Sequence, residues 1–218
     1  MPRTYFEREL EALHSDLIRM GSLIEEALAK SVKALEMGDK ELAKEIMSSD
    51  GKIDDLEKEI ESRCLRLILR QQPVAKDLRA ISTAIKMITD LERIGDQALD
   101  IADIVIRMEN GIGDIASDIP RMAIVASEMV GDSIKSYINT DLKLAQSTIN
   151  RDDEVDNYFE AVKIELIEIL KTDHSKADDA INAMMIAKYF ERIADHAVNV
   201  CEWVEFYETG RHKTAQIL

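Results

Sequence analysis

The stretch LERIGDQA at residues 91–98 returns as FERIADHA at residues 190–197, and five of the eight positions are identical. Each copy places a glutamate four residues before an aspartate: Glu92 with Asp96, and Glu191 with Asp195. A spacing of four puts both carboxylates on one face of a helix. Because the rest of that face is mostly apolar, the acids occupy the middle of a seam that is expected to pack against a neighbouring helix.

The repeat extends beyond this motif. DKELA at residues 39–43 matches DLKLA at residues 141–145, and DGKID at residues 50–54 matches DDEVD at residues 152–156, both with an offset of 102. Apolar residues recur at helical spacing nearly throughout, so the predicted fold class is all-α. We expect a duplicated three-helix unit, that is, six long helices in two tandem, pseudo-symmetric bundles.

Breaks in the helical pattern divide the chain. The three prolines stand at positions 2, 73 and 120, and the one glycine-containing linker covers residues 111–118. The first bundle is therefore expected in residues 1–110 and the second in residues 119–210, followed by a frayed tail in residues 211–218. Asp39 and Asp141 are expected to cap the helices that follow them.

Composition limits the classes of partner. The formal net charge of −15 argues against nucleic acid, which requires a basic face, and against an anionic membrane surface. No run approaches the roughly 20 apolar residues of a membrane span, and the amino terminus lacks a signal-peptide core. Cys64 and Cys201 lie in helical patterns and are expected to be buried and reduced. These features predict a cytoplasmic protein that is not membrane-inserted.

Each motif also has a second pair of acids to face it. Residues at equal distances from the turn of an antiparallel hairpin lie opposite one another. With the first turn at Pro73, Asp54 faces Glu92 and Asp50 faces Asp96. A second turn at residues 173 and 174 gives two further facing pairs: Asp156 with Glu191, and Asp152 with Asp195.

Four facing carboxylates repel one another, and a bound cation would offset that repulsion. An all-oxygen donor set suits hard metals. The residue one turn beyond each motif aspartate adds a further donor. The predicted metal ligands are therefore Asp50, Asp54, Glu92, Asp96 and Asp100 in the first copy, and Asp152, Asp156, Glu191, Asp195 and Asn199 in the second.

At these residues the chain resembles the PhoU family, the accessory regulators of bacterial phosphate uptake. The matching strings are DLERIGDQALDIAD from Asp90 and YFERIADHAVNVCEWV from Tyr189, with DGKID and DDEVD as their partners. The resemblance implies a multinuclear metal cluster at the ligands named above, with iron as the first expectation and zinc, manganese or magnesium as alternatives. The usual motif reads GDHAxN. Here Gln97 replaces its histidine and Asp100 its asparagine, so the first site is the more acidic.

The same resemblance implies a negative regulator of phosphate uptake and phosphate-responsive signalling rather than an enzyme. Its implied partners are components of the phosphate ABC transporter and a phosphate sensor histidine kinase, and its implied assembly is a homodimer. Two alternatives stay open. A ferritin-like di-metal enzyme would need a Glu-x-x-His motif, but Gly95 and Ala194 hold the histidine positions. A metal-free helical scaffold would use the acids as a docking face.

Overall fold

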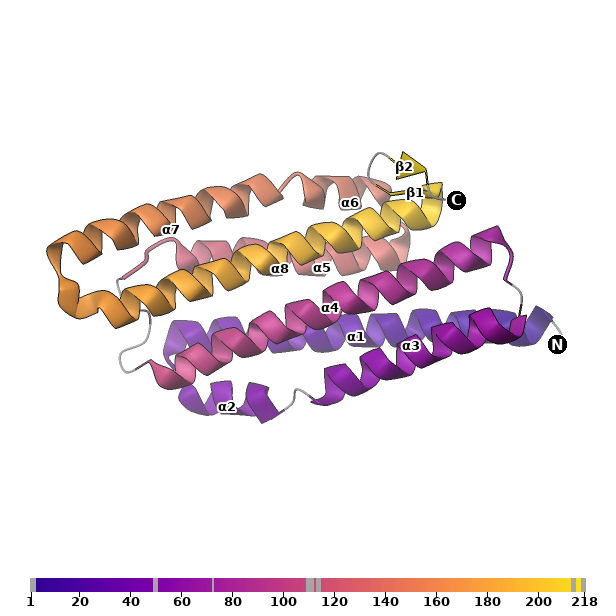
Figure 1. The fold of residues 1–218 in the computed structure, drawn as a ribbon, viewed down its shortest axis with the longest axis horizontal. Helices are drawn as coiled ribbons and strands as arrows, with labels where there is room; N and C mark the ends of the chain where they lie inside the picture. The colour runs from indigo at the N-terminus through magenta and orange to yellow at the C-terminus, as the bar shows by residue number, and fades with distance from the viewer. Residues whose placement is uncertain are drawn as a thin grey trace.

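The computed structural model describes residues 3–48, 51–71, 73–108, 112, 115–212 and 215–216, and it confirms an all-helical fold built as a tandem repeat (Figure 1). The first half contains the helices α1 (Arg3–Met37), α2 (Lys40–Ser48), α3 (Gly51–Gln71) and α4 (Ala75–Arg107). The second half contains α5 (Ile119–Asn139), α6 (Leu142–Ile149), α7 (Asp152–Thr172), a 3-10 turn (His174–Lys176) and α8 (Ala177–Thr209). Each half forms three long arms, and the middle arm combines two helices.

The division of each middle arm differs from the prediction of six uninterrupted helices. α2 ends at Ser48 and α3 begins at Gly51, while α6 ends at Ile149 and α7 begins at Asp152. The predicted caps are confirmed. The Oδ1 atoms of Asp39 and Asp141 each accept hydrogen bonds of 3.0–3.1 Å from backbone amides two and three residues ahead. Capping therefore starts both middle arms at equivalent positions of the repeat.

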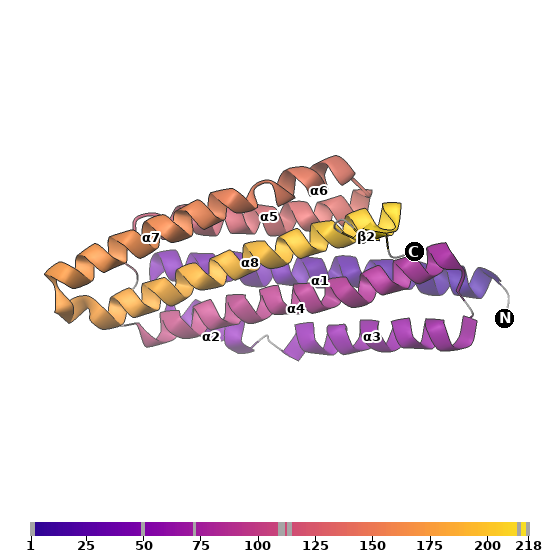
Figure 2. The same cartoon turned by 45° about the horizontal axis from the view of Figure 1, so that its top comes forward.

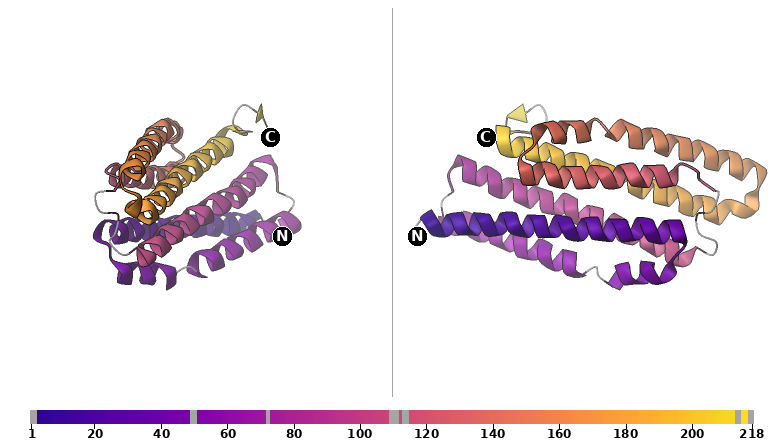
Figure 3. Two further views of the ribbon diagram at one scale, coloured as in Figure 1. Left: turned by 60° about the vertical axis from the view of Figure 1, so that its left-hand side comes forward. Right: turned by 180° about the vertical axis from the view of Figure 1, so that it is seen from behind.

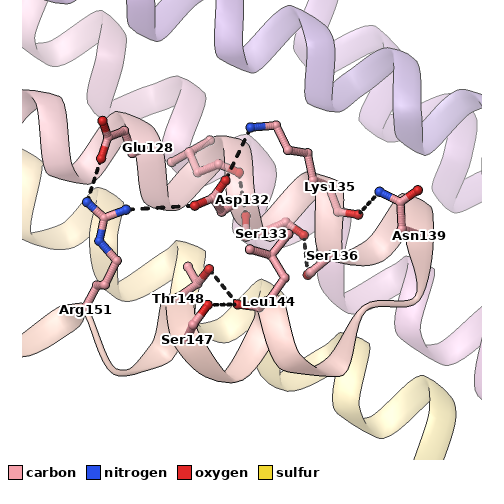
Figure 4. Close-up of polar contacts among 11 residues, drawn as sticks. Glu128, Asp132, Ser133, Lys135, Ser136, Asn139, Leu144, Ser147, Thr148 and Arg151 are labelled. Atoms are coloured by element: carbon pink, nitrogen blue, oxygen red, sulfur yellow. Dashed lines mark hydrogen bonds and ion pairs between the residues drawn. The ribbon is translucent and has the colours of Figure 1, made fainter.

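Arg151 accounts for the interruption in the second copy. Its amide donates to the carbonyl of Thr148, three residues back, instead of continuing the α-helical pattern. Its guanidinium lies 2.6 Å from a carboxylate oxygen of Glu128 and 3.9 Å from one of Asp132, both on α5 (Figure 4). These contacts tie the α6–α7 junction to α5 and fix the point at which α7 starts.

The two halves share one hydrophobic core. α4 and α8 lie side by side and antiparallel at the centre of the molecule (Figures 1 and 2). α1, α2 and α3 pack on α4, while α5, α6 and α7 pack on α8. α1 also contacts α5 across the repeat, so closely that a Cβ atom at Gly21 would lie 3.0 Å from the Cγ2 atom of Ile134. The two repeats therefore pack as a single body.

The two long hairpins turn at opposite ends of the elongated molecule. The α3–α4 turn lies at the end that also holds the start of α1 and the end of α8, and the α7–α8 connection lies at the other end (Figure 3). Beyond α8, β1 (Arg211–His212) pairs antiparallel with β2 (Ala215–Gln216), and the ring of His212 stacks on Trp203 with centroids 3.9 Å apart. The expectation of a frayed tail was therefore wrong for these described residues, because an aromatic contact and strand pairing hold them on α8.

Two further expectations can be compared with the structure. Cys64 and Cys201 are buried free thiols, as predicted. Within the described ranges, no helix combines the length and the apolar character that crossing a membrane requires.

Candidate metal centre

The second copy gathers its four predicted carboxylates where α7 packs on α8. Asp152 is the first residue of α7, and Asp156 follows one turn later. Burial raises the pKa of Asp152 to about 6, and the negative charges of Asp195, Asp156 and Glu191 add to the increase. The positive end of the α7 dipole would act in the opposite direction, so desolvation and like-charge repulsion dominate here. Among these charges, that of Asp195 has the largest effect on the pKa of Asp152. The facing of the two residues stays a prediction.

The other side of the second cluster shows the same repulsion. Burial raises the pKa of Asp195, and the charge of Glu191 raises it further. Lys188 forms a short ion pair with Glu191, whose side chain is 17% exposed. One ammonium group therefore offsets part of the charge of four carboxylates.

The first copy repeats this arrangement on α3 and α4. Burial raises the pKa of Glu92, and the charges of Asp96, Glu57 and Asp54 raise it further. Burial likewise raises the pKa of Asp96, and Asp54 again adds to the increase. The predicted ligand Asp50 lies outside the described residues. Of the four facing acids predicted in this copy, the three that are described, Asp54, Glu92 and Asp96, interact electrostatically.

Arg93 is the counter-charge in the first copy. Its guanidinium lies 3.4 Å from a carboxylate oxygen of Glu92 and 3.3 Å from one of Asp96. Glu57, which the sequence reading did not include, stands three residues after Asp54 on the same helix and adds charge to Glu92. A spacing of three on one helix face was the signal that could have identified Glu57.

The side chains do not form a closed coordination shell as they stand. Among the described residues, no three His, Cys, Asp or Glu side chains converge closely enough to hold an ion. The donor set nevertheless fits a hard cation, because it consists of carboxylate oxygens whose pKa values are raised by burial and mutual repulsion. A cation placed among them would relieve both effects, so metal ligation stays a prediction.

The fifth predicted ligand of each copy, Asp100 in the first and Asn199 in the second, forms a hydrogen bond with a residue of the other copy. The Nδ2 atom of Asn199 donates a 3.1 Å hydrogen bond to the Oδ1 atom of Asp90, which also lies 2.9 Å from the Nδ1 atom of His196. Asp100 is hydrogen-bonded by the phenol of Tyr189. Both residues thus take part in polar contacts between α4 and α8.

These two contacts are related by the repeat. With the offset of 99 residues, Asp90 corresponds to Tyr189 and Asp100 corresponds to Asn199. The interface therefore carries one acid–amide contact and one acid–phenol contact at equivalent positions. No periodicity within one helix could have identified Asp90, because its role depends on a helix from the other copy.

Comparisons with known proteins agree with this architecture. The family model described as PhoU domain matches residues 17–105 and again residues 119–204. The chain belongs to the PhoU family.

Several PhoU relatives match along nearly their whole length. A protein of Clostridium acetobutylicum called phosphate-specific transport system accessory protein PhoU homolog is 42% identical over 97% of both chains. The PhoU homolog 1 of Thermotoga maritima is 33% identical over 95% of this chain and 90% of its own.

Two PhoU crystal structures share the fold. PhoU of Pseudomonas aeruginosa superposes with a TM-score of 0.91 at 31% identity, covering 94% of this chain and all of that one. The phosphate transport system regulatory protein PhoU of Streptococcus pneumoniae superposes with a TM-score of 0.88 at 29% identity, covering 96% of this chain and all of that one. The fold and the family predicted from the sequence are confirmed.

Proposed function

We propose that this protein is a cytoplasmic negative regulator of phosphate uptake and phosphate-responsive signalling. The observation that carries the proposal is the match of both repeats to the PhoU domain, together with full-length relatives named as accessory proteins of phosphate-specific transport. The proposed partners are components of the phosphate ABC transporter and a phosphate sensor histidine kinase. A homodimer is the proposed assembly.

A strain lacking the gene and carrying a phosphate-starvation reporter tests this role. The reporter should be active in phosphate-rich medium without the gene and repressed when the gene is restored. Equal reporter activity with and without the gene in rich medium would refute negative regulation. Co-purification of transporter or kinase subunits from membranes of the same strain, with a deletion strain as control, tests the proposed partners.

The site itself supports an adaptor over a ferritin-like enzyme. The position three residues after the first motif glutamate is Gly95, where an added Cβ atom would meet Ile24 and Ile53 at 3.3 Å. The corresponding Ala194 is fully buried. These positions point into the core, so a histidine ligand of the Glu-x-x-His kind would have no room there. A lack of oxygen-dependent turnover by iron-loaded protein is the expected result.

We also propose that the acidic clusters bind metal, with iron expected first and zinc, manganese or magnesium as alternatives. The proposed ligands are those predicted from the sequence: Asp50, Asp54, Glu92, Asp96 and Asp100 in the first copy, and Asp152, Asp156, Glu191, Asp195 and Asn199 in the second. When bound, the metal would supply positive charge that balances the carboxylates and holds α3 on α4 and α7 on α8.

Elemental analysis of the untagged protein tests this proposal, beside a variant with Glu92→Gln, Asp96→Asn, Glu191→Gln and Asp195→Asn. Metal present in the native protein and lost in the variant would support metal sites. Absence of metal from native protein, even after loading with iron, manganese, zinc or magnesium, would favour the metal-free scaffold instead. Exchange of four exposed acids far from the clusters provides a variant with the same change in net charge.

A further inference from the structure

The end of the molecule formed by the α3–α4 turn carries a patch that the proposed function does not use. We call it the α3–α4 tip and define it by four exposed apolar and three exposed basic side chains: Leu65, Ile68, Leu69, Val74, Arg66, Arg70 and Lys76. Leu69 is 82% exposed and Val74 is 56% exposed. Ile68 and Leu69 follow Leu65 by three and four residues, so both lie near Leu65 on one side of α3.

The charge of this tip is opposite to that of the chain as a whole. The protein has 28 basic and 43 acidic residues, yet residues 62–79 contain five basic residues and one acidic residue. One of the five, Arg63, is already paired with Glu9 and Asp16 at 3.1 Å. Arg66, Arg70 and Lys76 form no ion pair with any acid that the structure describes, so their charges face solvent.

The second copy provides an internal comparison. The corresponding residues 164–178, at the opposite end of the molecule, contain two basic and four acidic residues. With the offset of 102 that relates α3 to α7, Ile167 is equivalent to Leu65, and it is 44% exposed. Ile164, one turn earlier on α7, is 61% exposed. Both turns therefore expose aliphatic side chains, but basic residues outnumber acidic residues only around the α3–α4 tip.

We propose that the α3–α4 tip docks on an anionic lipid bilayer surface. Basic residues beside exposed aliphatic side chains match such a surface, because anionic headgroups attract the cations while aliphatic groups enter the interfacial region. The tip contributes seven side chains, whereas a stable protein–protein interface uses about 20–30 residues on each side. A bilayer surface needs no matching shape, so it is the occupant that fits a small protruding patch.

Screening limits how far the net charge of −15 opposes this contact. α4 has 33 residues and is therefore about 50 Å long, whereas screening at physiological salt acts over about 8 Å. Acids in the middle and at the far end of the molecule are thus screened from a surface at the tip. Docking would be end-on and peripheral. The inference goes beyond the proposed regulatory role and does not rest on it or on metal binding.

Vesicle co-sedimentation of the full chain tests the proposal. Vesicles of phosphatidylcholine with about 30% phosphatidylglycerol should bind the protein, vesicles of phosphatidylcholine alone should bind it weakly, and high salt should reduce binding. Because each basic residue near an anionic surface contributes about fivefold in affinity, Arg66→Gln with Arg70→Gln should weaken binding about 25-fold. Leu69→Ser should weaken it separately, with its remaining binding still sensitive to salt.

The matched control is the other turn, where Lys163→Gln with Lys171→Gln and, separately, Ile164→Ser should leave binding unchanged. All of these side chains are at the surface, and unchanged circular dichroism and melting temperature would show that the variants fold. Absence of binding to the anionic vesicles, equal binding to neutral vesicles, or an equal loss in the control variants would each overturn the proposal. The proposal would also be overturned if the tip variants left vesicle binding unchanged but abolished self-association in sedimentation velocity or binding to polyglutamate. Either result would assign the patch to a protein partner.

Discussion

Replacing Asp152 with asparagine should stabilise the metal-free protein at neutral pH. The pKa of Asp152 is raised from 3.8 to about 6, because burial and the neighbouring carboxylates disfavour its ionised form. A carboxyl group whose pKa is higher in the folded state stabilises the fold below its unfolded pKa, and that stabilisation is lost as the pH rises through the folded pKa. The free energy of unfolding should therefore fall between about pH 4 and pH 6 because of this residue.

The size of the effect follows from the shift. At 1.36 kcal/mol for each pKa unit, the full shift would correspond to about 3 kcal/mol. Asp152 is only half-buried, so solvent screening reduces the expected value to about 1 kcal/mol. For a chain of this length, that gain corresponds to a rise in melting temperature of about 2–4 °C.

Urea denaturation of chelator-treated protein measures this difference. Asp152→Asn should be more stable than the native chain at about pH 7.5 and indistinguishable from it near pH 4, where the native carboxyl is protonated. Asp178→Asn is the matched control, because Asp178 is an exposed acid in the first turn of α8 and should yield no gain. A variant no more stable than the native chain at neutral pH, or a gain that persists undiminished near pH 4, would refute the repulsion argument. If the cluster binds metal, added metal should stabilise the native chain more than the variant.

Three further predictions follow from local features. Thr140 adopts the left-handed conformation, with φ at 52°, where Gly38 stands in the first copy with φ at 61°. Thr140→Gly should raise the free energy of unfolding by about 0.5–1 kcal/mol, and Gly38→Thr should lower it by about 1–2 kcal/mol. Chemical denaturation checks both, and equal effects of the two substitutions would contradict the strain argument. Asp90→Ala leaves two polar groups on α8 without their acceptor and should cost about 1–2 kcal/mol by the same assay, whereas an unchanged midpoint would show that this contact contributes nothing. Burial raises the pKa of the Cys64 and Cys201 thiols to about 12, so both should resist alkylation near pH 8 until the chain unfolds; rapid labelling of the native protein, followed by mass spectrometry, would disprove this.

Local sequence signals predicted most of the helical architecture correctly. The caps at Asp39 and Asp141 lie where a short acceptor side chain precedes an apolar-periodic run. The interruption of the middle arm in the second copy was not predicted, because residues 149–152 contain no proline or glycine to mark it. In the second copy the interruption depends on Arg151 reaching α5, and a contact between distant segments leaves no mark on the local pattern.

In the candidate site, too, some features could be predicted from local sequence signals and others depend on contacts between distant segments. The facing of Asp152 and Asp195 is a prediction from helical spacing and hairpin register, and the structure adds that the charge of Asp195 raises the pKa of Asp152. The contacts of Asp100 and Asn199 could not be predicted in this way, because both residues lie at the contact of α4 with α8. Their partners come from the other repeat.

The sequence by itself determined the helices, their duplication and the placing of acids on one seam of each copy, because these depend on spacing within a helix and on distance from a turn. Only the tertiary structure decided how the two copies combine. The antiparallel packing of α4 on α8 makes one shared core, joins Asp90 to Asn199, and places the basic α3–α4 tip and the acidic second turn at opposite ends. The physical reason is that packing between repeats depends on shape and charge complementarity of surfaces far apart in the chain, which a periodic pattern does not specify.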